Sequence, residues 1–117
     1  MRLNEITYND AVPVDGYGTG YFRIGGKRHD GALLVLPTGV SAWGGYQDTA
    51  TILEAKADID VLFVGTGAEI AHLPADFRTT LEDAGIGVEA MASPAACRTY
   101  NVLLSEGRRV AVALIPL

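Results

Sequence analysis

Continuous apolar runs along the chain predict the strands of a buried sheet. The first run is Ala32–Leu36, which Pro37 ends, and the second is Val61–Val64. Two later segments, Ile86–Met91 and Arg108–Leu117, are also predicted as strands. A strand that is apolar at successive positions is typical of a sheet covered on both faces. We therefore expect these segments to form the centre of the fold.

Apolar residues at helical spacing lie between two of these strands. Phe77, Leu81 and Ala84 share one face of a predicted helix, because they are four and three positions apart. Pro74 suits the first turn of this helix, where its fixed φ is favourable, and Gly85 is a typical C-terminal stop.

Two further helices are predicted from their start signals. Ser93 offers a capping hydroxyl before Pro94, and that helix runs to about Glu106. A shorter helix is capped by Asp48 or Thr49. Strands that alternate with helices through short connections predict an α/β fold with a largely parallel central sheet.

The N-terminal part of the chain has a different pattern. Residues 1–20 hold alternating glycines and no helix signal, which predicts an irregular extended lead-in. Extended segments at Tyr21–Ile24 and Lys27–Leu36 flank Gly25-Gly26, which is the pattern of a β-hairpin. Antiparallel pairing in this hairpin makes the predicted sheet mixed.

Composition and charge narrow the function classes. The chain of 117 residues is long enough for one domain, with the α/β core over residues 21–117, and 49% of its residues are hydrophobic. It has 9 basic and 14 acidic residues and a net charge of -5, which argues against binding nucleic acid or anionic lipid. No apolar run is long enough to insert into a membrane. A secretory signal is absent and one cysteine fits a reducing compartment, so we predict a cytoplasmic protein.

Two loops at strand ends are candidate ligand sites. Gly65-Thr66-Gly67 follows a strand, as a dinucleotide-binding fingerprint does, but Ile70 stands where the third glycine belongs. The alternative is a tight loop of small residues. The backbone amides after Ser93 can hold an anion with Arg98 at the rim, or Ser93 can simply cap its own helix.

Catalytic and metal chemistry is not predicted. Cys97 follows the helix start at Ser93, where the helix dipole can lower a thiol pKa, but it shares an apolar arc with Tyr100. We therefore expect an inert residue at the edge of the core. His29 and His72 are not at metal-ligand spacing from each other or from Cys97, so neither a metal nor a cofactor is expected.

An aromatic pair, Trp43 and Tyr46, lies in the stretch Thr38–Tyr46, which we predict to be a loop. The start of this stretch resembles a nucleophile elbow, but Trp43 stands where the last glycine belongs. The aromatic pair can anchor a partner, or it can be a lid over the sheet edge. We expect it to belong to an exposed contact surface.

Several of these segments resemble a known family. They are Gly31–Pro37 followed by Trp43, Val61–Gly67, Gly85–Met91, and Ala95–Leu104 with Glu106–Val110. From about Leu3 onwards the chain is similar to the small domain of unknown function in mitochondrial complex I assembly factor 3 and the adipogenesis-associated proteins. The resemblance implies a three-layer α/β fold on a mixed sheet. It implies an assembly role rather than a reaction, and it supplies no catalytic residues.

Two functional hypotheses follow from the sequence. The first is a non-enzymatic binding or assembly module with an unidentified protein partner, in which Trp43 and Tyr46 make contact. The second is a small-molecule or anion-binding protein, or an enzyme, with its site between Gly65–Gly67 and the helix start at Ser93. A homo-oligomer is compatible with both hypotheses.

Overall fold

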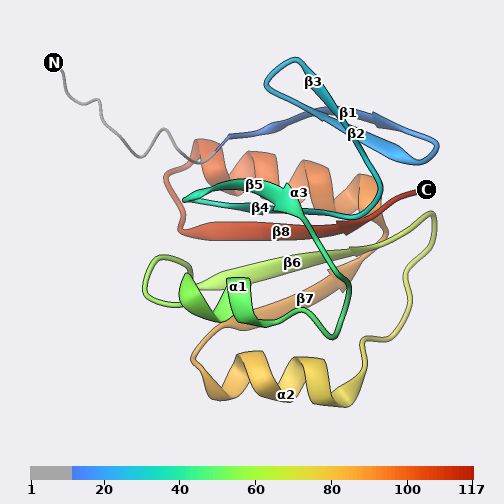
Figure 1. Ribbon diagram of the computed structural model, residues 1–117. Coiled ribbons are helices and arrows are strands. Elements are labelled where there is room, and N and C mark those ends of the chain that lie inside the picture. Colours follow the sequence, from blue (N-terminus) through green and yellow to red (C-terminus); the bar gives the residue numbers. More distant parts are fainter. Residues whose placement is uncertain (1–11) are drawn as a thin grey trace, which may run out of the picture.

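The central element of the structure is a five-stranded mixed sheet. The computed structural model describes residues 12–117, and in Figure 1 this sheet crosses the middle of the molecule. Its strands are β4 (Leu33–Leu36), β5 (Gly39–Ala42), β6 (Val61–Thr66), β7 (Gly87–Met91) and β8 (Val110–Ile115), in the order β5-β4-β8-β6-β7. The α/β class and the mixed sheet are confirmed. Parallel pairing does not dominate, because β6 pairs parallel with β7 and β8 whereas β4 pairs antiparallel with β5 and β8.

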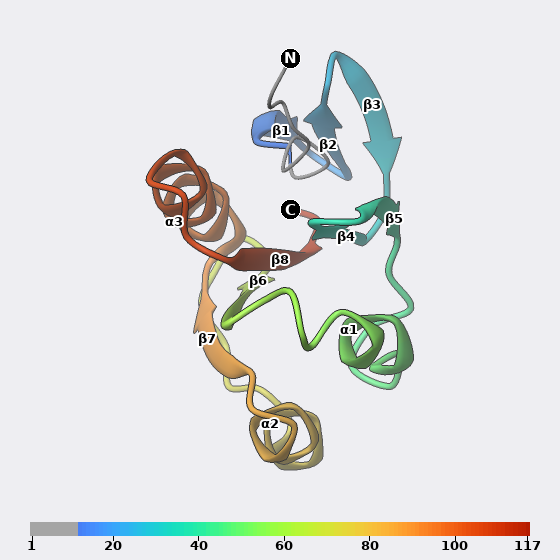
Figure 2. The same ribbon diagram turned by 90° about the vertical axis from the view of Figure 1, so that its left-hand side faces the viewer.

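Helices lie on both faces of this sheet. α3 (Ser93–Ser105) covers one face, while α1 (Ala50–Glu54) and α2 (Ala75–Asp83) lie on the other, as Figure 2 shows. The predicted helices are confirmed to within a few residues. Pro74 stands at the N-cap of α2 rather than in its first turn, and Gly85 follows its C-terminus with a φ of 89°.

A second, smaller sheet is formed by the N-terminal strands. β1 (Val14–Gly18), β2 (Tyr21–Ile24) and β3 (Lys27–Asp30) pair antiparallel in that order, above α3 in Figure 1. The predicted hairpin is confirmed, but one strand over Lys27–Leu36 is wrong. The chain turns at Gly31, whose φ of 83° favours glycine, and then passes from the small sheet into the central one.

Two other sequence predictions need correction. The predicted lead-in, residues 1–20, is not irregular over Val14–Gly18, which is β1. Its first eleven residues lie outside the described part of the chain. The predicted loop Thr38–Tyr46 contains the edge strand β5. Four residues with little hydrophobic pattern are enough for an edge strand, because the neighbouring β4 dictates the pairing.

Strand β8 shows how the central sheet builds two cores. Its residues alternate in direction, as side chains of a strand do. Val110, Val112 and Leu114 pack with α3 and the small sheet, whereas Ala111 and Ala113 pack with α1 and α2. All five are buried, which confirms that this apolar run is a strand covered on both faces.

Candidate functional site

The structure brings the two predicted loops together at one end of the sheet. The Gly67 N–H donates to Ser93 Oγ over 2.9 Å, and the Ser93 N–H donates to the Gly67 carbonyl over 2.7 Å. Ser93 Oγ also donates to the Ile115 carbonyl over 2.6 Å. The Ser93 side chain is fully buried, so its hydroxyl joins the ends of β6 and β8 to the start of α3.

The prediction that Ser93 caps its own helix is wrong. Ala92 occupies the N-cap of α3, and no side-chain capping hydrogen bond is present there. Gly65 explains why Ser93 sits so close. A Cβ at Gly65 would lie 2.7 Å from Ser93 Oγ, 2.8 Å from Ser93 Cα and 2.9 Å from Leu114 Cδ2. Glycine therefore serves close packing of strand against helix at this position.

Arg98 lies farther along α3 and is exposed. It shares its helix with Ser93, but its side chain is not part of the buried junction. Ligand binding by Gly65, Thr66, Gly67, Ser93 and Arg98 together stays a prediction.

Thr66 fixes the loop that follows β6. Its hydroxyl donates to the Glu69 carbonyl over 2.7 Å and accepts from the Ala71 N–H over 3.0 Å. The same oxygen lies 3.3 Å from the Met91 carbonyl at the end of β7. These contacts hold the chain from Glu69 to Ala71 beside β7, so the loop has a defined position without regular structure.

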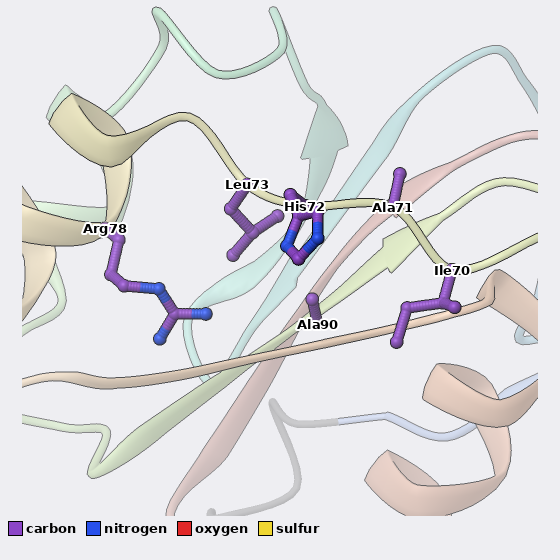
Figure 3. A pocket seen from close by; sticks show the side chains of 6 residues that line it. All are labelled: Ile70, Ala71, His72, Leu73, Arg78 and Ala90. Atoms are coloured by element: carbon purple, nitrogen blue, oxygen red, sulfur yellow. The ribbon is translucent and has the colours of Figure 1, made fainter.

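An open cavity of about 250 Å³ lies beyond this loop, between it, α2 and β7. Figure 3 shows the six residues that line it, which are Ile70, Ala71, His72, Leu73, Arg78 and Ala90. The His72 ring and the Arg78 guanidinium extend into this space. Ile70 is 67% exposed, a high value for a large apolar side chain. Four apolar residues and two nitrogen-bearing groups suit a small ligand with an apolar part, or one side chain of a partner protein.

Arg78 closes part of the free edge of the sheet at this cavity. β7 is an outer strand, so its backbone groups on that side have no neighbouring strand. Arg78 Nη1 donates to the Val88 carbonyl over 2.9 Å and to Glu82 Oε2 over 3.2 Å. The guanidinium therefore satisfies one edge carbonyl, and Glu82 compensates its charge. This cavity was not predicted from the sequence, because an apolar residue in an expected loop, Ile70, is the one signal of it that the sequence carries.

Trp43 of the aromatic pair is buried, and Tyr46 is half-buried. Trp43 is 5% exposed, and its ring centroid lies 5.6 Å from that of Tyr46 and 6.0 Å from that of Phe77. Trp43 Nε1 donates to the Asp48 carbonyl over 3.1 Å. The expectation that Trp43 belongs to an exposed surface is wrong, because its ring packs against Phe77 of α2. Partner contact through Trp43 and Tyr46 stays a prediction.

Cys97 occupies the buried side of α3, as expected. It is 4% exposed, and burial raises the pKa of its thiol to about 11, although the nearby Arg98 charge opposes this shift. At neutral pH such a thiol is protonated, and the thiol form is a poor nucleophile. The helix dipole therefore does not produce a reactive cysteine here.

Tyr100 and Asn101 connect α3 to the N-terminal part of the described chain, which the sequence did not predict. Tyr100 Oη donates to the Val12 carbonyl over 2.8 Å, and burial raises the pKa of this phenol. The Asn101 amide accepts from the Val14 N–H and donates to the Val14 carbonyl, each over 2.8 Å. Asn101 thus pairs with β1 as a neighbouring strand would, and it fixes the small sheet to α3.

Arg109, just before β8, connects to the residues that precede β6 at the other end of the sheet. Its Nη2 lies 3.1 Å from Asp60 Oδ1, and its Nη1 donates to the Ala57 carbonyl over 2.9 Å. The hydrogen bond from Arg109, followed by its charge, lowers the pKa of the Asp60 carboxyl. These groups are exposed, so the pair serves local geometry more than stability.

Two classes of feature are absent from residues 12–117. That part of the chain has no group of three or more histidine, cysteine or acidic side chains arranged to hold a metal ion. It also has no helix of the length and apolar character needed to cross a bilayer.

Comparisons with known proteins agree with the resemblance found in the sequence. A family model described as protein of unknown function (DUF498/DUF598) matches residues 14–115. An uncharacterized protein of Rhodobacter capsulatus is 44% identical over 117 residues, which cover 100% of this chain and 94% of that protein. NADH dehydrogenase [ubiquinone] 1 alpha subcomplex assembly factor 3 of Rattus norvegicus is 35% identical over 125 residues. This match covers 99% of the chain but 66% of the rat protein.

One solved structure is similar to this chain in both fold and sequence. A protein from Bartonella henselae, described as an outer membrane protein, superposes with a TM-score of 0.84 at 37% sequence identity. The match covers 90% of this chain and 94% of that one. The small sheet and the central sheet therefore occur together in a related protein.

Proposed function

The chain belongs to the DUF498/DUF598 family, and on this premise we propose that it is a non-enzymatic, protein-binding module that serves the assembly of a larger complex. The observation that carries the proposal is its 35% identity with the rat assembly factor over 99% of its own length. By the same analogy, we take the client to be a respiratory NADH dehydrogenase. Because the chain spans 66% of the rat protein, the proposal concerns the segment that the two share.

The polar groups of residues 12–117 support a binding role by what they contact. The Ser93 hydroxyl is occupied by two backbone partners, and the Cys97 thiol is buried. Ser93, which the sequence offered as a helix cap or part of an anion site, instead joins backbone segments, and Cys97, which was considered as a nucleophile, is packed in the core. We take residues 12–117 to be a single three-layer domain, because the central sheet contributes residues to both apolar clusters, one on each of its faces.

A chimera tests the assembly role. Residues 14–115 of this chain replace the matching segment of the rat factor, in cells that lack that factor. We expect the chimera to restore assembled NADH dehydrogenase, measured by native electrophoresis. The control is the rat factor with an unrelated domain of similar size in the same place. A chimera that accumulates but restores no more complex than this control would refute the proposal.

The cavity lined by Ile70 and Arg78 favours a second candidate, small-molecule binding. This cavity lies near the end of β6, where a ligand was predicted from Gly65–Gly67. It is lined by the loop that Thr66 holds and not by the Ser93 junction. A screen of small carboxylates by thermal midpoint tests this candidate. A stabilising ligand whose effect is lost in Arg78→Gln, but kept in Arg98→Gln, would support the cavity over the Ser93 junction.

Location is the third part of the proposal. The one cysteine is buried and unpaired, which fits the reducing cytoplasm. Fractionation of the source cells tests this, with the chain expected in the cytoplasmic fraction.

A further inference from the structure

The cations of this acidic chain are distributed unevenly. The whole chain has a net charge of -5, yet the β2–β3 hairpin carries Arg23, Lys27 and Arg28 within ten residues. Within the small sheet, Asp15 and Asp30 are the acidic residues. By contrast, residues 54–89 hold eight acidic residues and two basic ones. The small sheet therefore presents positive charge at one end of an otherwise acidic molecule.

Two of these cations lie directly opposite each other. Arg23 of β2 and Arg28 of β3 are register partners, so their side chains leave the same face of the sheet. Phe22 and Ile24 alternate with Arg23 and are buried against α3, which places the arginines on the outer face. Like charges directly opposite each other destabilise a strand pair. An anion bound between the two arginines would offset their repulsion.

Tyr21 forms a platform under both guanidinium groups. The Arg28 guanidinium carbon lies 4.1 Å from the Tyr21 ring centroid, and that of Arg23 lies 5.9 Å away. The ring itself covers Gly18 of β1, because a Cβ at Gly18 would overlap the ring atoms. Stacking on an aromatic face preorganises an arginine fork for a carboxylate and reduces the entropy lost on binding.

The arginine pair is only partly neutralised within the described chain. Arg28 Nε donates to Asp30 Oδ1 over 2.8 Å, and their side chains are 54% and 74% exposed. Among the ion pairs formed within residues 12–117, Arg23 has none. A second carboxylate between the two arginines would offset their repulsion and use both forks.

We propose that the outer face of the β2–β3 hairpin binds an acidic segment of a protein partner, with carboxylates held by Arg23 and Arg28 on the Tyr21 platform. This inference rests on the proposed protein-binding function and names the chemistry of the partner. A short acidic peptide fits better than a long polyanion, because three cations cover a small area. A polyanion long enough to extend past the hairpin would be repelled by the acidic residues of segment 54–89.

Titration with a capped octaglutamate peptide tests the inference. The full chain, labelled with ¹⁵N, is observed by NMR at low ionic strength. We expect amide shifts within residues 21–30, and about tenfold weaker binding in the double variant Arg23→Gln/Arg28→Gln, since two charge-assisted contacts are lost. The matched control, Lys56→Gln/Arg108→Gln, removes the same charge elsewhere and should bind within twofold of the original chain.

Several results would overturn this assignment. They are the absence of binding, shifts centred outside the hairpin, or an equal loss of affinity in the control variant. A DNA duplex with the same number of charges that binds the hairpin as tightly would refute the acidic-peptide partner. If the glutamine variant unfolds, Arg23→Lys/Arg28→Lys decides the matter. It keeps the charge but loses the planar forks, so unchanged affinity in it would contradict the proposed geometry.

The peptide experiment can fail independently of the proposed function. A chimera that restores assembly even with Arg23→Gln/Arg28→Gln would refute the hairpin surface while the assembly role stands. A hairpin that binds the peptide in a chain whose chimera restores nothing would refute the assembly role alone.

Discussion

At the scale of single residues, burial changes the chemistry of the one cysteine in the chain. Burial raises the pKa of Cys97 to about 11, so its ionisation should begin well above neutral pH. We expect slow labelling by thiol reagents at pH 8 and rapid labelling once the chain is unfolded, measured by mass spectrometry.

The sign of this shift gives a further expectation. The thiol of an unfolded chain ionises near about pH 8.5, whereas the folded Cys97 thiol, with its raised pKa, stays protonated at that pH. The contribution of the buried Cys97 thiol to the free energy of unfolding is therefore fully present below the pKa of the unfolded thiol. It is lost as the pH rises through the folded pKa of about 11. A native thiolate that titrates below pH 7 would contradict the buried assignment.

Gly65 is the residue on which the junction at Ser93 depends. Gly65→Ala places a methyl group 2.8 Å from the Ser93 Cα, where backbone must move. We expect destabilisation by about 1–3 kcal/mol, as overpacking usually costs, measured by chemical denaturation. Gly16→Ala is the matched control, because a Cβ there meets nothing within 4 Å. Equal stability of the two variants would show that the junction is not tightly packed.

At the scale of elements, an aromatic cluster joins the chain after β5 to α2. The rings of Trp43, Tyr46 and Phe77 pack edge to face or tilted against one another, and Trp43 and Phe77 are buried. Trp43→Ala should cost about 3–5 kcal/mol, the usual range for a buried aromatic, and lower the thermal midpoint strongly. If the midpoint is unchanged while partner capture weakens, Trp43 acts at a contact surface instead.

The contact between α3 and β1 is a second link between elements. Asn101→Ala removes both hydrogen bonds to Val14 and should cost about 1–2 kcal/mol. Hydrogen exchange should speed up in β1–β3 while the central sheet stays protected. Ser105→Ala is the control on the same helix, since its hydroxyl bonds only within the last turn. Uniformly faster exchange in both sheets would contradict a local role for Asn101.

The elements with strong periodicity were predictable from sequence, and the short ones were not. α2 and the apolar strands β6 and β8 follow from spacing and burial alone. The boundary between β3 and β4 was missed, because a glycine such as Gly31 can continue a strand or turn it. β5 was not predicted, because hydrogen bonding to the neighbouring β4 determines that it is a strand, and its own four residues carry little strand signal.

The candidate site was predictable only in part. The convergence of Gly67 and Ser93 follows from the rule that parallel strand ends meet at one edge. The cavity at Ile70 and Arg78 depends on how an irregular loop lies beside an edge strand, which local sequence does not determine. Pairing of Asn101 with Val14 joins positions 87 residues apart, so no local pattern reveals it.

At the scale of the whole molecule, the two sheets and three helices of residues 12–117 carry their basic and acidic residues at different ends. The basic hairpin projects from one end, and the acidic segment around α2 lies at the other, as Figure 1 illustrates. Such separation orients an approaching charged partner and accelerates its encounter, with an effect that salt weakens.

The central claim is that this chain acts by binding another protein, and its native particle in the source cells tests this most directly. The chain is tagged at its natural expression level, purified without denaturant, and its particle is measured by native mass spectrometry. The account predicts a mass well above the 12.4 kDa of one chain, with a second protein in fixed ratio. A particle that holds only this chain, alone or as copies of itself, would contradict the account.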